Sequence, residues 1–184
     1  AKRPVMVWLH GGAFSYGSAN SPRYDSTNLA QKNDVVVVAV NHRLNAFGHL
    51  DLSAHGERFA QSGNVGVLDL VLALEWVRDH AARFGGDPGN VTIFGQSGGG
   101  GKVSALLAMP QGKGLFHKAI VQSGSSVRFA ERERTTQLAD AVLKHLGVGA
   151  DQLQTVPIVK LSEAIVPAQK TLPRPRHPLL DRYN

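Results

Sequence analysis

Val91-Thr92-Ile93-Phe94-Gly95-Gln96-Ser97-Gly98-Gly99 is an apolar run of β-strand character that leads directly into a serine between glycines. A serine hydroxyl is a useful nucleophile only when the backbone holds it in the open, near a base and near donors for an oxyanion. In a G-x-S-x-G turn the strand stops abruptly and a helix begins, so side chains at the flanking positions would clash with both elements. The pattern therefore predicts a nucleophile turn at Ser97, and a plain glycine turn is the alternative.

The segment after the serine supports the nucleophile turn. Residues 103–109 form a short apolar run of helical character that stops at Pro110, and the motif requires a strand before the serine and a helix after it. In that geometry Gly98, the residue after the serine, turns its N–H toward a substrate carbonyl.

Strand and helix patterns alternate along the rest of the chain. The apolar runs predict strands at 4–9, 35–40, 91–94 and 118–122. Helical spacing or composition predicts a helix ending over 28–32, helices over 64–84, 103–109 and 131–146, and two short helices within 151–168. The connecting segments are expected as a loop at 41–48, a polar surface excursion at 53–63, a turn at 87–90 and an extended Pro-rich segment at 172–178.

This order predicts an α/β fold with a mostly parallel sheet flanked by helices, and ligands at the carboxyl ends of the strands. We expect one domain over residues 1–184, with a core over 4–147 and a weaker helical and Pro-rich segment over 148–184. A second Gly-rich stretch, His10-Gly11-Gly12-Ala13-Phe14, follows the first predicted strand. Its small residues leave backbone N–H groups unobstructed, as an anion-stabilising loop requires, and a simple glycine turn is again the alternative.

Composition narrows the classes of function. The net charge is +6, but the basic residues are scattered and form no stripe with interleaved aromatic residues, so we expect no nucleic-acid partner. The chain has no cysteine and no histidine pair at metal-ligand spacing, so we expect no metal and no cofactor. No apolar run is long enough to span a bilayer, and the first residues do not form a signal peptide. The compartment, cytoplasmic or secreted, stays open.

The spacing from Phe84 to Gly99 resembles the serine signature of the type-B carboxylesterase and lipase family, which includes the cholinesterases and has the α/β-hydrolase fold. The matching pattern is Phe84-Gly85-Gly86, four residues, and then the stretch from Val91 to Gly99. The resemblance runs from Val5 to about Val127. It also includes residues 8–14, 41–44 with 47–48, 64–69, 116–120 and 122–124.

The resemblance implies a serine hydrolase that acts on a small carboxylic ester through an acyl-enzyme on Ser97. It also implies an oxyanion hole formed by the backbone N–H groups of Gly12, Ala13 and Gly98. Two small departures are visible: Ala13 stands where many members have a third glycine, and Gln96 stands where glutamate is commoner. The family's acid and histidine would follow Asn184, and the family has additional strands before the first one here. We therefore expect an internal piece of a longer esterase.

Three histidines follow the serine, namely His117, His145 and His177. We expect each to be packed or solvated, because His117 leads into a strand, His145 lies on the core face or core edge of a helix, and His177 is in the Pro-rich tail. Possible acids after the serine are Glu131, Glu133, Asp140, Asp151, Glu163 and Asp181. The alternative functions are a catalytically silent binding protein of the same fold, and an inactive esterase fragment that lacks the acid and the histidine. Exposed sheet edges would also favour self-association.

Overall fold

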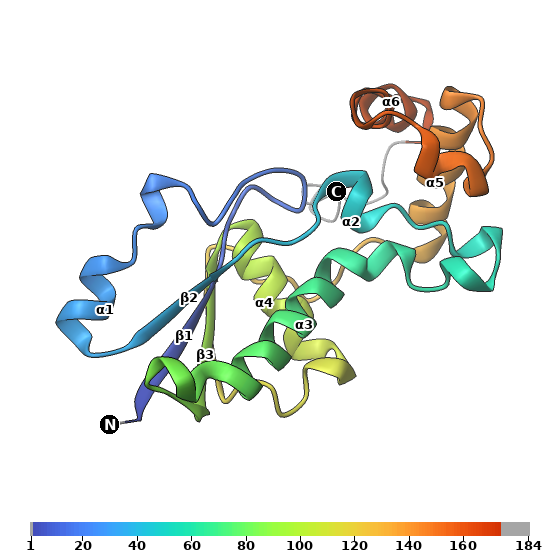
Figure 1. Cartoon of the computed structure of the whole chain (residues 1–184). Coiled ribbons are helices and arrows are strands. Elements are labelled where there is room, and N and C mark those ends of the chain that lie inside the picture. Colours follow the sequence, from blue (N-terminus) through green and yellow to red (C-terminus); the bar gives the residue numbers. More distant parts are fainter. Residues whose placement is uncertain (1, 174–184) are drawn as a thin grey trace. The chain divides into compact units, whose positions relative to one another are not determined.

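The computed structural model of the chain describes residues 2–173 and contains a parallel sheet (Figure 1). Its strands are β1 (Arg3–Leu9), β2 (Val36–Val40), β3 (Gly86–Gln96) and β4 (Lys118–Gln122). They lie in the order β2-β1-β3-β4, and every neighbouring pair is parallel. The predicted parallel sheet of an α/β fold is therefore confirmed.

Helices connect the strands and follow the last one. The α-helices are α1 (Thr27–Asn33), α2 (Asn45–His49), α3 (Val65–His80), α4 (Gly98–Ala108), α5 (Arg132–Leu146) and α6 (Ile158–Thr171). Short 3-10 turns span Pro22–Tyr24, Ser53–His55, Glu57–Phe59, Ser62–Asn64, Ala81–Phe84, Pro110–Gly112 and Ala150–Thr155. Within residues 2–173, no helix has the length and apolar character needed to cross a bilayer.

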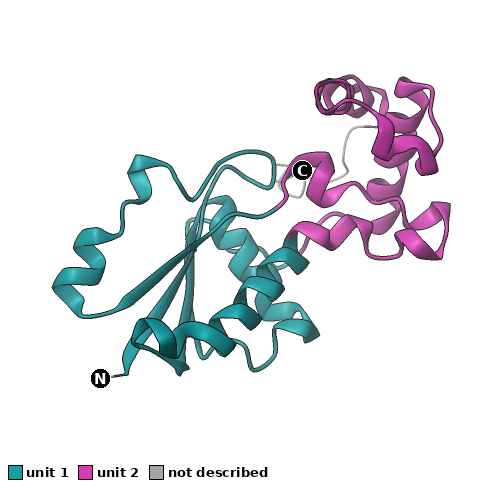
Figure 2. Ribbon diagram, viewed as in Figure 1, with its two compact units in different colours: residues 1–42, 67–127 teal, residues 43–66, 128–184 magenta. Residues whose placement is uncertain are grey.

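The chain divides into two compact units (Figure 2). Unit 1 comprises residues 1–42 and 67–127, and unit 2 comprises residues 43–66 and 128–184. Nothing in the sequence pattern marked this division, and the expectation of one domain stays a prediction.

The core of unit 1 lies between the sheet and two helices. Side chains alternate between the two faces of a strand, and the buried members Val5, Val7 and Leu9 of β1 fall on one face. The helices α3 and α4 lie together on that face (Figure 1). They add Leu70, Leu74, Val77, Val103 and Leu106 to the same apolar cluster.

The order of the strands places a switch point between β1 and β3. From β1 the chain passes through α1 to β2, whereas from β3 it passes through α4 to β4, on the other side of β1. Leu29 of α1 contributes to a hollow with Trp8 and Phe94, whose side chains lie on the face opposite to α4. The two connections therefore leave adjacent strands toward opposite faces. In open α/β sheets, ligands bind outside the carboxyl ends of the strands at such a point.

Unit 2 has a separate, helical core. Residues of α5 pack against residues of α6, and Leu50 and Leu52 join them. The buried residues of the two helices are Ala139, Val142, Leu143, Leu161, Ala164, Ile165 and Ala168. The segment expected as a surface excursion forms three 3-10 turns, and its Phe59 packs against this core. Only the tertiary structure supplies the apolar surface that holds Phe59.

Two local predictions were wrong in detail. The expected loop over 41–48 contains the short helix α2. The expected turn over 87–90 lies within the bounds of β3, where the pairing passes from Arg3 with Gly86 to Val5 with Val91. The intervening residues form a bulge, in which the Asp87 carboxylate accepts a hydrogen bond of 2.9 Å from the Gly89 N–H. The sequence indicated a turn at 87–90, but not that these residues lie within a longer strand.

Candidate active site

The two Gly-rich loops of unit 1 lie side by side because the strands before them are neighbours. Leu9 at the end of β1 pairs with Gly95 near the end of β3. The loop that begins at His10 therefore leaves the sheet next to Ser97. The side chain of Asn41, which follows β2, accepts a hydrogen bond of 2.8 Å from the Ala19 N–H and anchors the far end of the first loop.

Ser97 has an unusual backbone conformation, with φ 56° and ψ −123°, and its residue is half-buried. Its N–H donates to the Gln122 carbonyl at 2.8 Å, and its carbonyl accepts from the Gly101 N–H at 3.1 Å. These bonds fix the serine between β4 and the first turn of α4. A non-glycine residue in such a sparsely populated region costs about 1–3 kcal/mol and persists only where its surroundings enforce it.

The first loop turns sharply after β1. The Gly12 carbonyl accepts hydrogen bonds from the N–H groups of Ser15, at 3.2 Å, and Tyr16, at 3.1 Å. Ala13 follows with φ 55°, a left-handed conformation that costs an L-residue about 1–2 kcal/mol. This turn brings the backbone of Ala13 to the start of α4.

Gly98 makes this close approach possible. A Cβ atom added at Gly98 would lie 2.4 Å from the Ala13 Cα and 2.5 Å from the Ala13 nitrogen. The next residue is as crowded, because a Cβ atom at Gly99 would lie 2.0 Å from the Leu9 carbonyl oxygen. The structure thus brings together all four residues singled out in the sequence: Ser97, Gly12, Ala13 and Gly98.

His10 supports this loop from inside the core. Its side chain is fully buried, its Nδ1 lies 2.7 Å from the Gly11 carbonyl oxygen, and its ring lies 4.9 Å from the His42 ring, between centroids. Burial lowers the pKa of His10, and the charge of Lys102 lowers it further, against the opposing effect of the bond to Gly11. A neutral, buried imidazole with a main-chain partner suits a structural anchor.

Lys102 is a site residue that the sequence analysis did not single out. The side chain is fully buried, its Nζ donates to the His10 carbonyl at 3.0 Å, and it lies 5.6 Å from the centroid of the Phe14 ring. Burial lowers the pKa of Lys102 from 10.5 to about 8. A signal was present, because Lys102 is the single charged residue of α4 and precedes Leu106 by one helical turn.

The histidines after the serine lie elsewhere. His117 lies just before β4 and is held by Val91. Its ring Nδ1 accepts a hydrogen bond from the Val91 N–H at 3.1 Å, and its main-chain N–H donates to the Val91 carbonyl at 2.8 Å. Ser97 is at the other end of β3, roughly 20 Å away at about 3.3 Å per residue. His145 is exposed on α5 of unit 2. The expected core or core-edge position was therefore wrong, because Val142 and Leu143 define the packed side of the helix. His177 and Asp181 lie outside the described residues.

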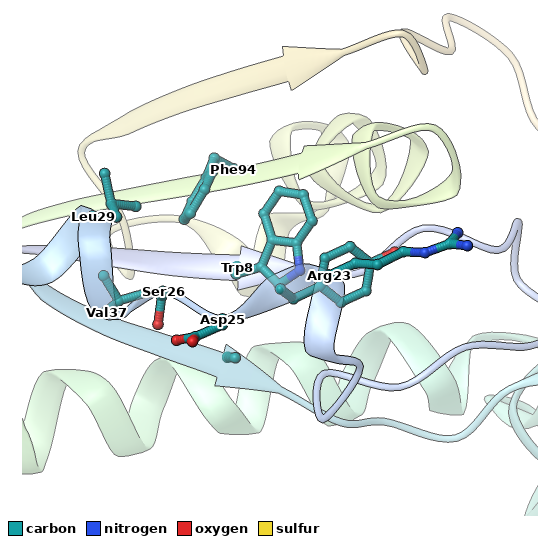
Figure 3. Close-up of a pocket in the computed structure, with 9 residues that line it drawn as sticks. Trp8, Arg23, Asp25, Ser26, Leu29, Val37 and Phe94 are labelled. Atoms are coloured by element: carbon teal, nitrogen blue, oxygen red, sulfur yellow. The ribbon is translucent and has the colours of Figure 1, made fainter.

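A hollow of about 180 Å³ lies on one face of the sheet in unit 1 (Figure 3). Trp8 and Phe94 line it from β1 and β3, with residues 23–26 and Leu29 opposite. The Trp8 ring lies 4.9 Å from the Phe94 ring and 5.1 Å from the Tyr24 ring, between centroids. None of the four predicted site residues lines this hollow. Within residues 2–173, no three histidine, aspartate or glutamate side chains gather as metal ligands would.

Known proteins match this chain closely over part of their length. The model of a family described as the carboxylesterase family matches residues 1–172. The para-nitrobenzyl esterase of Bacillus subtilis is 47% identical over 167 residues, which are 91% of this chain and 34% of that protein. The liver carboxylesterase of Sus scrofa is 49% identical over 127 residues, which are 69% of this chain and 21% of that protein.

Solved structures agree with the α/β-hydrolase prediction. The crystal structure of a carboxylesterase from Geobacillus stearothermophilus matches with a TM-score of 0.88 and 43% identity. The match covers 93% of this chain and 37% of the carboxylesterase chain. An esterase from Clostridium hathewayi matches with a TM-score of 0.82 and 46% identity. The match covers 99% of this chain and 38% of the esterase chain. The chain thus spans about a third of the length of these structures.

Proposed function

Because the chain belongs to the carboxylesterase family, we propose that it carries the nucleophile and the oxyanion hole of a serine ester hydrolase. Ser97 is the nucleophile, and the N–H groups of Gly12, Ala13 and Gly98 receive the oxyanion. This division of roles uses the four residues that meet at the switch point between β1 and β3.

One observation carries the proposal, namely the contact between Gly98 and Ala13 beside Ser97. The main chains of the two residues are so close that a Cβ atom at Gly98 would overlap Ala13. This contact supports a pair of donors, one from the first loop and one from the start of α4, that is in place before any substrate binds. Preorganised donors of this kind stabilise the charge that develops in the transition state, because they need no reorganisation during the reaction.

The chemistry follows in two halves. The Ser97 oxygen attacks the ester carbonyl carbon, its proton passes to a base, and the carbonyl oxygen becomes the oxyanion. The carbon–oxygen bond to the alcohol then breaks, and the alcohol leaves with a proton from the protonated base. Water attacks the acyl-serine in the same way and releases the carboxylic acid and free Ser97.

We propose that the base and its acid partner come from chain outside residues 1–184. Two facts support this assignment. The B. subtilis esterase, of which the matched segment is 34%, has room for them in the rest of its length. His117 is bound to Val91 at the far end of the strand that leads to Ser97. A base must come within about 3 Å of the serine oxygen or act through one water.

The relatives suggest a class of substrate. The B. subtilis relative is named for para-nitrobenzyl esters, and the C. hathewayi esterase is described as able to hydrolyse aliphatic aromatic polyesters. We propose an uncharged carboxylic ester, for which a para-nitrophenyl ester of a short carboxylic acid is a practical probe.

The test is covalent labelling of the full-length protein by a fluorophosphonate, read by intact mass. We expect one adduct, which Ser97→Ala removes and Ser104→Ala retains. Ser104 is a matched control because it lies on α4, the helix that follows Ser97, where its hydroxyl donates to the Gly100 carbonyl at 3.1 Å. A folded protein that takes up no adduct would refute the proposed nucleophile and favour a silent binding protein, whereas an adduct that survives Ser97→Ala would refute it by placing the nucleophile at another residue.

A further inference from the structure

The surroundings of Lys102 disfavour a positive charge. Lysine is almost never fully buried unless it is paired, yet this side chain has no exposed surface. It extends from a buried stretch of α4 to the residue after β1. The helix begins at Gly98, so the positive end of its dipole is also nearby. A methionine of similar length would avoid the burial of a charge.

The ammonium group has a specific main-chain partner. Its Nζ donates to the His10 carbonyl at 3.0 Å, and the Phe14 ring lies 5.6 Å away at its centroid. His10 is the last residue before the two glycines of the first loop. The same helix carries Gly98 at its first position. One hydrogen bond therefore connects the stem of the first loop to the helix that follows the serine.

The rest of the His10 environment fixes the same stem. The His10 Nδ1 lies 2.7 Å from the Gly11 carbonyl oxygen, and a Cβ atom at Gly17 would lie 2.6 Å from that nitrogen. The ring is therefore enclosed by its own loop, while the lysine holds the carbonyl on the other side. Small shifts of this peptide would move Gly12 and Ala13, which follow it directly.

We propose that Lys102 is a positioning residue of the oxyanion hole, where its bond to the His10 carbonyl keeps the N–H groups of Gly12 and Ala13 aligned with that of Gly98. The inference rests on the proposed function. In this role Lys102 acts neither as the nucleophile nor as the base. Alignment of this kind affects the transition state more than substrate binding, because the oxyanion exists only during the reaction.

The test replaces Lys102 with methionine in the full-length protein, and uses Lys118→Met as the matched control. Lys118 also donates from Nζ to an oxygen, that of the Asn90 side chain at 2.9 Å, but it is exposed on β4. For a para-nitrophenyl ester we expect Lys102→Met to lower kcat about 10- to 100-fold with KM changed less than about twofold. Lys118→Met should leave both constants unchanged.

Two further measurements separate positioning from general support of the fold. A trifluoromethyl ketone forms a tetrahedral adduct with a serine and places an oxyanion in the hole, so its affinity should fall in Lys102→Met by the same factor as kcat/KM. The thermal midpoint should stay unchanged or rise, because a buried charge has been removed. Lys102→Gln retains an N–H donor and should recover part of the lost rate.

Distinct outcomes overturn the inference. Unchanged kinetics in Lys102→Met would refute it, and so would a loss of rate that follows a lower thermal midpoint without loss of ketone affinity. If Lys102→Met does not fold, Lys102→Gln takes its place in the ketone measurement. A folded Lys102→Gln that binds the ketone no better than Ser97→Ala does would also refute the positioning role. A wild-type protein that neither hydrolyses the ester nor takes up the fluorophosphonate would instead refute the proposed function.

Discussion

The two compact units bury different kinds of side chain. Among the described residues, the polar residues that are buried as a whole are His10, Thr92 and Lys102, and all three belong to unit 1. The cluster at the centre of unit 2 is made of apolar residues from α5, α6 and the segment around Leu50. Polar burial and strained backbone are costly, and proteins hold them where a site requires them.

Backbone strain has a similar distribution. Ala13, Ser97 and Ser123 have φ values of 55°, 56° and 51°, and all three follow the carboxyl ends of strands in unit 1. In unit 2, Asn45 has a φ of 55° at the start of α2, where its side chain accepts a hydrogen bond from the Ala46 N–H. Apart from Asp34, whose φ is 50° at the end of α1, the non-glycine residues of unit 1 with positive φ therefore lie at the strand ends of the candidate site, whereas the core of unit 2 is organised by apolar packing. Variants in each unit can test this contrast.

The largest expected effect comes from Gly98→Val. The new side chain would overlap the Ala13 backbone and displace two proposed oxyanion donors. We expect kcat for ester hydrolysis to fall roughly 10²- to 10³-fold or more, the typical effect of losing one such donor. The control is Gly149→Val in unit 2, where an added Cβ meets only the Gln152 side chain at 3.6 Å and φ is −80°. Equal rates in the two variants would remove the distinction between the units.

In unit 2 the largest effect should be on stability. Leu161 is 5% exposed in the helical core, and its replacement by alanine should lower the free energy of unfolding by about 2–5 kcal/mol. Hydrogen exchange of the α5 and α6 amides measures the change. Ile158→Ala on the same helix is the control, since Ile158 is 70% exposed and should change stability by less than about 0.5 kcal/mol. Similar exchange in both variants would contradict the packing account.

The pH dependence of stability should reveal the buried lysine of unit 1. Burial lowers the pKa of Lys102 from 10.5 to about 8, so the unfolded chain binds more protons than the folded chain between these values. Stability then rises with pH across that window. Relative to Lys102→Met, the free energy of unfolding should gain about 3 kcal/mol from pH 7 to pH 10.5. The neighbouring His10 is neutral over that range because burial lowers its pKa below 6.5.

Urea unfolding of both proteins at several pH values measures this difference directly. Subtraction of the variant removes the contributions of other titrating groups that the two chains share. A difference that stays constant from pH 7 to pH 10.5 would show that the Lys102 amine titrates at its ordinary value. It would also weaken the contrast between unit 1, which buries polar side chains, and unit 2, whose core is apolar.

The smallest effect is expected for Ala13→Gly. Glycine adopts the left-handed conformation at this position without the steric cost that alanine has, but the unfolded chain gains freedom. The two terms oppose each other, so we expect a change of less than about 1 kcal/mol in stability and less than about twofold in kcat/KM. Thermal unfolding and ester hydrolysis test this together. A tenfold loss of kcat/KM would show that the alanine side chain itself shapes the hole.

Local patterns were sufficient for the strands and for the serine turn. The apolar run at 91–94 identified β3 because buried parallel strands have continuous apolar sequences, and the run at 118–122 matched β4, whose residues are largely exposed. The glycines around Ser97 identified the strand-to-helix turn because the G-x-S-x-G pattern is typical of it, although the residues that crowd Gly98 and Gly99, Ala13 and Leu9, lie far earlier in the chain. The roles proposed for Ser97, Gly12, Ala13 and Gly98 stay predictions until the labelling experiment is done.

Other features depended on partners far along the chain. Phe59 was expected at the surface, and it packs against the core that α5 and α6 form some 80 residues and more further on. The position of Lys102 on an otherwise uncharged helix was a weak signal, because a lysine is ordinarily solvated and its partner, His10, lies 92 residues earlier. The prediction for His145 was wrong because helical spacing shows several apolar positions but not which of them meet α6.

The sequence by itself determined the alternation of strands and helices, the parallel sheet, and the glycine-flanked serine at the end of a buried strand. These features follow from steric limits and apolar periodicity within short segments. Only the tertiary structure decided that Ala13 touches Gly98, that Lys102 is buried against His10, and that α5 and α6 share an apolar core. Such contacts join residues distant in sequence, and the free energy of burying them depends on surfaces that exist only once the chain has folded.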